Sequence, residues 1–211
     1  MKKTVLILLI LLLFTVFASG SRESWASVGG EVGHAMETQS VGGTQINTTL
    51  NTIGLHFTAL QFDNGEDIGV IIHDSFHLPI GGKITIGETP LDYSFSDADF
   101  KSYIGIMVGP AFRKPLGGGK DFYIGAGPSV QQIAVSAGNS VISYLFGIGA
   151  NTGVKMDIGE KTYWDVGVMA DISFYSYVTS SSSPNGQSGS MFNLSLRPHI
   201  GIGYKLKMKY E

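Results

Sequence analysis

The sequence predicts an all-β fold, an eight-stranded antiparallel up-and-down transmembrane β-barrel. Three observations predict it: an unbroken alternation of apolar and polar residues over 192–210, seven further stretches with the same alternation, and short connections that alternate with long ones. Side chains along a strand point to opposite faces in turn, so each of these stretches has one apolar face and one polar face.

The C-terminal stretch "MFNLSLRPHIGIGYKLKMKYE" shows the pattern most clearly. Every even-numbered residue from Phe192 to Tyr210 is apolar or aromatic, and the odd-numbered residues between them are polar, charged or glycine. Strands of globular proteins usually have about 5–6 residues, whereas a strand needs about 9–11 residues to cross a bilayer. The remaining predicted strands lie within residues 25–36, 51–60, 67–78, 103–113, 122–132, 146–158 and 163–175.

The N-terminus has the pattern of a secretory signal peptide. Lys2 and Lys3 precede the apolar run "VLILLILLLFTVF", and the small residues "ASG" follow at 18–20. We expect cleavage after Gly20, which leaves residues 21–211 as one barrel domain; the alternative is an uncleaved membrane helix, for which the apolar run is short. Cleavage removes 2 of 14 basic residues, so 12 basic and 17 acidic residues remain, a formal charge of −5.

Composition excludes several classes of site. The chain has no cysteine, which excludes disulfides, thiolate metal sites and a lipid attached to an N-terminal cysteine. Its net charge of −3 and the lack of a basic patch give no sign of nucleic-acid binding. After Gly20 no apolar run is long enough for a transmembrane helix, so a membrane-embedded chain must cross as strands. No cofactor is expected.

The connections between the predicted strands alternate in length. The short ones are "FDNGED", with the hairpin signal Asn64–Gly65, then "RKPLGGGKD" and "GEK". The longer ones cover about 37–51, 79–100, 135–142 and 178–190. An outer-membrane barrel with both termini in the periplasm shows this asymmetry. We therefore expect extracellular loops, of which 79–100 and 178–190 are the candidates for contact with extracellular ligands.

The polar face distinguishes a membrane barrel from a soluble one. A soluble barrel needs charged residues on its outer face, but here the polar face consists mainly of Gly, Ser, Asn and small residues, which suit a narrow interior. Aromatic residues are predicted to form two belts at the lipid–water boundaries. One belt contains Trp25, Phe62, Phe112, Phe122, Tyr163, Trp164 and Tyr204, and the other contains Phe76, Tyr103, Phe174, Tyr177 and Phe192.

Four segments, "FYIGAGPSV", "GIGANTGVKMDI", "WDVGVMADISFY" and "RPHIGIGYKLKMKY", carry a family resemblance. With them the chain resembles the small eight-stranded outer-membrane barrels of diderm bacteria, of the OmpA/OmpX/OmpW type. The resemblance implies contact with outer-membrane lipid and recognition of a terminal aromatic by the barrel-insertion machinery. Here Tyr210 is followed by Glu211, which departs from the family pattern.

The inward face is predicted to hold a polar network. Buried charges need partners, so we expect Glu31 or Asp171 to pair with Arg197 or Lys155. The alternative is a polar route through the barrel, although eight strands leave an interior that side chains nearly fill. The predicted network consists of Glu31, His56, His73, Lys155, Asp171, Arg197 and His199.

The segment "HDSFH" raises the question of catalysis. His73 and Ser75 share a face and could belong to a nucleophilic triad, as in outer-membrane barrels that hydrolyse lipid acyl chains. The predicted register turns both residues inward, away from lipid, and no GxSxG stretch occurs. His73 and His77 lack a third metal ligand at a useful spacing. No catalytic or metal-binding residue is therefore predicted.

These patterns favour a non-enzymatic, integral outer-membrane protein with a structural or interaction role at the cell surface. Two alternatives stay open at this point. One is a narrow porin-like or OmpW-like conduit for small or hydrophobic solutes, and the other is the lipid acylhydrolase.

Overall fold

The computed structural model describes residues 22–41, 44–63, 65–86, 89–91, 99–137, 139–180 and 183–208. The predicted signal peptide, Asn64, Tyr210 and Glu211 lie outside these residues. Within them the chain forms nine strands: β1 (Arg22–Val41), β2 (Thr44–Asp63), β3 (Ile68–Ile86), β4 (Thr89–Leu91), β5 (Asp99–Gly117), β6 (Lys120–Ala137), β7 (Asn139–Asp157), β8 (Thr162–Ser180) and β9 (Ser183–Met208).

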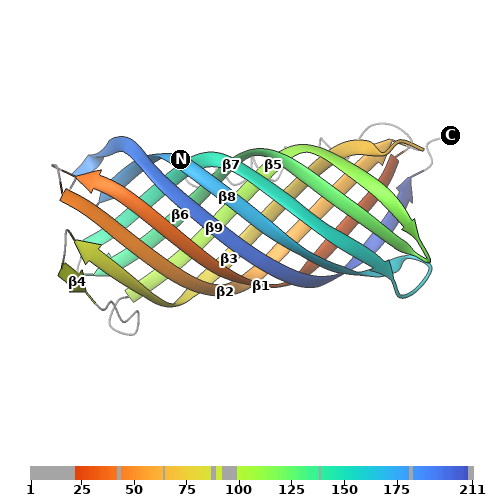
Figure 1. Cartoon of the computed structure of the whole chain (residues 1–211), viewed down its shortest axis with the longest axis horizontal. Coiled ribbons are helices and arrows are strands. Elements are labelled where there is room, and N and C mark those ends of the chain that lie inside the picture. The colour runs from red at the N-terminus through yellow and green to blue at the C-terminus, as the bar shows by residue number, and fades with distance from the viewer. Residues whose placement is uncertain are drawn as a thin grey trace.

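The strands close into a ring. Neighbours pair antiparallel in the order β2-β1-β9-β8-β7-β6-β5-β3, and a further pairing of β2 with β3 completes the cylinder. The short β4 pairs only with the end of β3 among the described residues. Figure 1 shows the long strands tilted around the cylinder. The predicted fold class is confirmed, and closure gives each of the eight long strands a neighbour on both sides, as a strand protein in lipid requires.

The strands are longer than the predicted stretches. The eight long strands contain 18–26 residues each. Segments 37–51, 135–142 and 178–190, which were predicted to be loops, consist mostly of strand: β1 extends to Val41 and β8 to Ser180, for example. Cross-strand pairing continues through these Ser- and Thr-rich segments, because it satisfies backbone groups that an open loop would leave to water.

The two ends of the barrel differ. Arg22 pairs with Met208, so the first and last described strands meet at one end, which also carries the short connections at 65–67, 118–119 and 158–161. We call this the turn end and the opposite one the loop end. Glycines at positive φ make two of these turns, Gly65 (83°) after β2 and Gly118 (61°) after β5.

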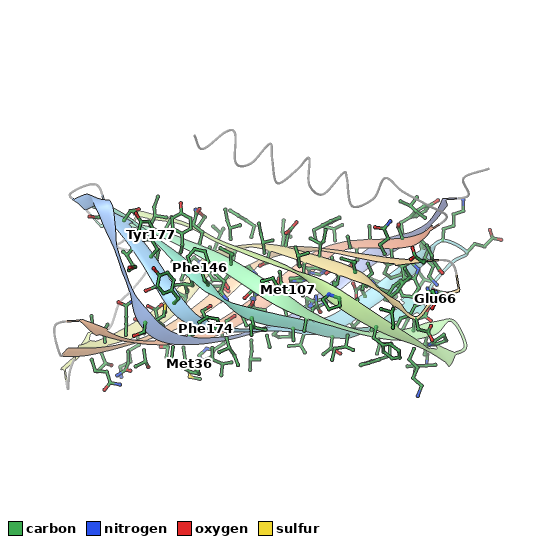
Figure 2. The ribbon with its side chains drawn as sticks, turned by 90° about the horizontal axis from the view of Figure 1, so that it is seen from above. Met36, Glu66, Met107, Phe146, Phe174 and Tyr177 are labelled. Carbon is green, nitrogen blue, oxygen red and sulfur yellow. The ribbon has the colours of Figure 1, made fainter. Side chains whose placement is uncertain are left out.

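Apolar side chains cover the outside of the barrel. Val166, Ile148 and Leu196 point outward and are 39–59% exposed, whereas Asp171 and Lys155 on the other face are fully buried. In Figure 2 the side chains project outward along most of the cylinder, with Glu66 at the turn end and Tyr177 toward the loop end. A surface of this kind is fitted to acyl chains rather than to water. None of the described residues forms a helix long and apolar enough to span a membrane.

The interior near the turn end contains a hydrophobic core. Trp25, Phe62 and Tyr163 were predicted to lie in one boundary belt and Tyr103 in the other, but all four point into the barrel and are at most 2% exposed; only Tyr103 lies outside this core. Each occupies a position of the polar-face parity, so the strand geometry turns it inward. The core consists of Trp25, Leu60, Phe62, Ile71, Met107, Ala111, Tyr123, Tyr163 and Met169.

Candidate functional site

On the loop-end side of this core, buried polar and charged side chains fill the barrel. They come from strands that lie far apart in the sequence and face one another across the narrow lumen. The structure places all seven residues of the predicted network inside, each at most 5% exposed: Glu31, His56, His73, Lys155, Asp171, Arg197 and His199.

Arg197 of β9 is the centre of the first group. Its guanidinium donates hydrogen bonds to the Asp171 carboxylate on β8 and to the Ser75 hydroxyl on β3, and its Nε lies 3.6 Å from Glu31 Oε1. The guanidinium carbon also lies 5.6 Å from the centre of the Tyr103 ring. One cation therefore connects β1, β3, β8 and β9, and it neutralises part of the charge on two buried carboxylates.

Two histidines complete this central ion group. Glu31 Oε2 lies 3.2 Å from His77 Nε2 and 3.7 Å from His73 Nε2. Thr52 Oγ1 lies 2.8 Å from His77 Nδ1. The imidazoles face Glu31 on the side that Arg197 does not reach, so this carboxylate has polar neighbours on both sides. We use "central ion group" below for Glu31, His73, Ser75, His77, Asp171 and Arg197.

Glycine makes room for the long Arg197 side chain. A Cβ atom added at Gly105 would lie 2.7 Å from Arg197 Nη1 and 2.9 Å from Ser75 Oγ. Separations this short require the guanidinium or the hydroxyl to move. The inward glycine of β5 thus leaves the space in which Arg197 crosses the lumen.

A second group surrounds Lys155 of β7. Its ammonium donates hydrogen bonds to Asp165 Oδ2 at 3.1 Å and to the Tyr163 hydroxyl at 3.2 Å. The same ammonium lies 4.2 Å from the Tyr163 ring centre and 4.9 Å from that of Tyr123. Ser27 also donates to Asp165 Oδ2, and Tyr123 donates to Oδ1 at 3.0 Å. Although Lys155 is fully buried, its charge is compensated by a carboxylate and two aromatic faces.

His56 and His199 lie beside His73 of the central ion group, and the three imidazoles form a cluster. The ring centres of His56 and His199 are 4.5 Å apart, and both lie within 5.7 Å of the His73 ring. His73 Nδ1 lies 2.8 Å from both Thr58 Oγ1 and Asn151 Nδ2. His56 is different, because neither of its ring nitrogens has a hydrogen-bond partner.

Charged pairs also line the turn end. Arg113 donates to Glu23 at 2.8 Å and lies over the Phe62 ring at 4.6 Å. Lys205 lies 2.6 Å from Asp157. These pairs cover the aromatic core on its turn-end side, so charged, aromatic and again charged layers follow one another along the lumen.

The position of Ser75 gives no support to lipid hydrolysis. Its side chain is buried inside the barrel, and its hydroxyl oxygen accepts a hydrogen bond from Arg197. A serine nucleophile needs a base that accepts its proton and a path to the acyl group. The guanidinium of Arg197 is a donor and cannot act as that base.

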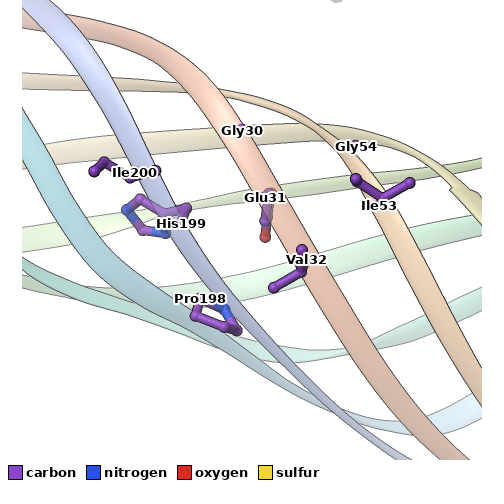
Figure 3. Close-up of a pocket in the computed structure, with 8 residues that line it drawn as sticks. All are labelled: Gly30, Glu31, Val32, Ile53, Gly54, Pro198, His199 and Ile200. Carbon is purple, nitrogen blue, oxygen red and sulfur yellow. The ribbon is translucent and has the colours of Figure 1, made fainter.

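The outer wall has a depression where β1, β2 and β9 meet. Its volume is about 450 Å³, and Figure 3 shows the residues that line it: Gly30, Glu31, Val32, Ile53, Gly54, Pro198, His199 and Ile200. The ladder between β1 and β9 is interrupted here, since pairing passes from Glu31–His199 to His34–Leu196. Pro198 has no N–H to donate, which accounts for the missing rung.

Sequence reasoning did not assign Tyr123 or the aromatic core to the candidate site. The alternation of faces could have indicated part of the core, since Tyr163 lies on the same inward face as Asp165 and Trp25 lies on the same inward face as Ser27. The contacts themselves join positions as far apart as Ser27 and Asp165, 138 residues along the chain, and no local pattern contains them.

Comparisons with known proteins show the fold. No protein-family model matches the chain, and no curated protein sequence matches it. Among solved structures, Neisserial surface protein A is 16% identical over 89% of this chain and 100% of its own, with a TM-score of 0.53. OprG from Pseudomonas aeruginosa is 13% identical over 89% of this chain and 97% of its own, with a TM-score of 0.59.

A third solved structure is that of AlkL in lipid bilayers. It is 16% identical over 92% of this chain and 95% of its own, with a TM-score of 0.57. At these identities the likeness shows a shared fold, the small outer-membrane β-barrel. Together with the apolar outer face, it makes the chain an integral membrane barrel of the outer-membrane type.

Proposed function

We propose that the protein is a surface-exposed outer-membrane barrel whose loop end contacts extracellular ligands or neighbouring surfaces, and whose lumen conducts no solute. In this orientation the turn end and the chain termini are periplasmic, and the barrel-insertion machinery is a partner during biogenesis. The observation that carries the proposal is the filled lumen, combined with strands that continue past the apolar belt at the loop end.

The filled lumen argues against a pore. Arg197, Lys155 and Tyr103 reach into the interior at different levels, and each side chain is at most 2% exposed to solvent. Below them the aromatic core around Trp25 closes the turn end. A solute passing along the axis would have to displace paired charges and packed rings, which is costly in a narrow barrel.

The described part of the loop end presents mainly polar side chains, among them the exposed Lys83 of β3. On β1 the apolar outer face ends near Met36, and Thr38 and Gln39 follow; Thr38 donates a hydrogen bond to Asn47 of β2 across the hairpin. On β9 the outer face is exposed and polar at Ser188–Ser190 before Phe192 begins the apolar belt. Hydroxyl and amide groups on paired strands suit binding by hydrogen bonds.

Cysteine labelling tests the orientation, since the chain has no cysteine of its own. We expect a membrane-impermeant maleimide to label Ser188→Cys on intact cells and to label Glu66→Cys, at the turn end, only after lysis. Labelling of Glu66→Cys on intact cells would reverse the orientation. Planar-bilayer recording of the refolded protein tests the lumen: we expect no reproducible openings, and discrete unitary currents would contradict the proposal.

A lateral conduit is the second candidate function, and the wall depression favours it. The interrupted ladder between Val32 and Pro198 offers a place where a small hydrophobic molecule could leave the barrel into lipid without passing the turn end. A Val32→Cys/Pro198→Cys pair would lock β1 to β9 when oxidised. We expect uptake of a fluorescent fatty acid by proteoliposomes to equal that of protein-free vesicles. Uptake that stops on oxidation of the pair would favour the conduit instead.

A further inference from the structure

The structure assigns a second chemistry to the interior: we propose that His56, His199 and Asp165 form a buried binding site for a late first-row divalent cation, of which Zn²⁺ is the probe. One potential ligand atom from each residue lies within 4.8 Å of the other two. The three residues come from β2, β9 and β8, and all are buried.

The independent observation is the unsatisfied imidazole of His56. This side chain is only 2% exposed to solvent, and both of its ring nitrogens lack a hydrogen-bond partner. Nδ1 of the neighbouring His199 lacks one as well. Buried polar atoms are almost always paired, and an exception calls for a bound water or ion. A cation held between the two rings would take one nitrogen from each of them as a ligand.

The geometry needs only small adjustments. A tetrahedral Zn²⁺ with bonds of about 2.0–2.2 Å keeps its ligand atoms roughly 3.4 Å apart. The His56 and His199 rings, whose centres are 4.5 Å apart at 51°, are tilted rather than stacked. The ligand atoms lie within 4.8 Å of one another, so binding requires the side chains to move these atoms closer together.

Asp165 has an oxygen to offer. Ser27 and Lys155 occupy Oδ2, whereas Oδ1 accepts a hydrogen bond only from Tyr123 among the described contacts. The Tyr123 hydroxyl also lies 3.2 Å from His199 Nε2, so it is placed to orient both ligands. The outer partners of a metal site commonly have this arrangement. The positive charge of Lys155 repels a cation bound nearby, so we expect the affinity of the site for the metal to be modest.

The donor set selects the class of metal. Two imidazoles and one carboxylate without a thiolate suit Zn²⁺, Ni²⁺, Co²⁺ or Cu²⁺, and suit Mg²⁺ and Ca²⁺ poorly. His73 completes the group as a third imidazole, with ring centres 5.5 and 5.7 Å from the other two. Because the lumen is filled, we expect the ion to enter as the barrel closes during folding rather than by diffusion through the finished barrel.

The test refolds the protein in detergent micelles with Zn²⁺ or Co²⁺ and then removes free metal by gel filtration. We expect one ion per chain and, with Co²⁺, the visible absorption of a tetrahedral site. His56→Gln should weaken Zn²⁺ binding by at least about tenfold. His34→Gln is the matched control, because this exposed histidine lies on the outer face and bonds Asn51.

Each outcome decides the proposal. Metal-free wild-type barrel after refolding with Zn²⁺ and Co²⁺ overturns it, and so does equal binding by wild type and His56→Gln. If His56→Gln does not fold, as judged by heat-modifiable gel migration, His199→Gln replaces it. The Co²⁺ spectrum of the wild type then still stands as a measurement that needs no variant.

Discussion

Replacing Arg197 by methionine keeps most of the side-chain volume but removes the positive charge that Asp171 and Glu31 share. Arg197 is 2% exposed and donates to both Asp171 and Ser75, while Glu31 lies 3.6 Å from its Nε. Removing one member of a buried ion pair costs about 3–5 kcal/mol, because the partner stays buried without its counter-charge. We therefore expect Arg197→Met to lower the free energy of unfolding by about 3–5 kcal/mol.

Urea unfolding in lipid vesicles measures this change. The two tryptophans report it in different surroundings, because Trp25 lies in the core and Trp164 lies on the outer face. Asp171→Asn alone and the Asp171→Asn/Arg197→Met double variant complete a double-mutant cycle. We expect the double variant to lose less than the sum of the single losses, by about 1 kcal/mol or more, since contacting residues couple.

The reasoning has a clear point of failure. If Arg197→Met unfolds within about 0.5 kcal/mol of the wild type, as ordinary surface substitutions do, then Arg197 does not hold the central ion group together. A second refuting result is strict additivity in the cycle. It would mean that the Asp171 contact contributes nothing of its own to stability.

Two pairs of positions in the wall give further predictions. Gly147→Ala should lower the free energy of unfolding by about 1–3 kcal/mol, because a Cβ atom on this β7 residue collides with the Ile172 carbonyl oxygen of β8. Gly30→Ala should be nearly neutral, because a Cβ atom there meets open space. Ile148→Arg in the middle of the apolar face should cost about 2–4 kcal/mol, and Leu116→Arg at the turn end about 0–1 kcal/mol. Urea unfolding in vesicles checks both pairs, and equal costs at Ile148 and Leu116 would argue against a membrane-embedded belt.

The alternation of side chains carried most of the fold prediction. The period of two assigned Val166 and Leu196 to one face and Asp171 to the other, and the exposed fractions agree. Aromatic residues were placed by a weaker argument, their nearness to strand ends. That argument was wrong for Trp25 and Tyr163, because the parity of a position decides its face whatever the residue type.

The lengths of the strands were underestimated for a related reason. Apolar alternation stops where the barrel leaves the lipid, as at Met36 on β1, but backbone pairing does not stop there. Thr38 and Asn47 continue the β1–β2 ladder with polar side chains on the outside. A pattern of hydrophobicity indicates which residues face lipid. It does not indicate which residues pair by backbone hydrogen bonds, so it cannot show where a hairpin ends.

By itself the sequence determined the closed all-β architecture, the apolar outer face and the set of polar residues that point inward, since these depend on local periodicity and on the solvent. Only the tertiary structure decided which of those residues meet. The tilt and stagger of the closed barrel bring Arg197 to Ser75, 122 residues away, and bring His56 to His199 and Asp165. Contacts across the lumen depend on how eight strands are offset around a ring, and no single strand contains that offset.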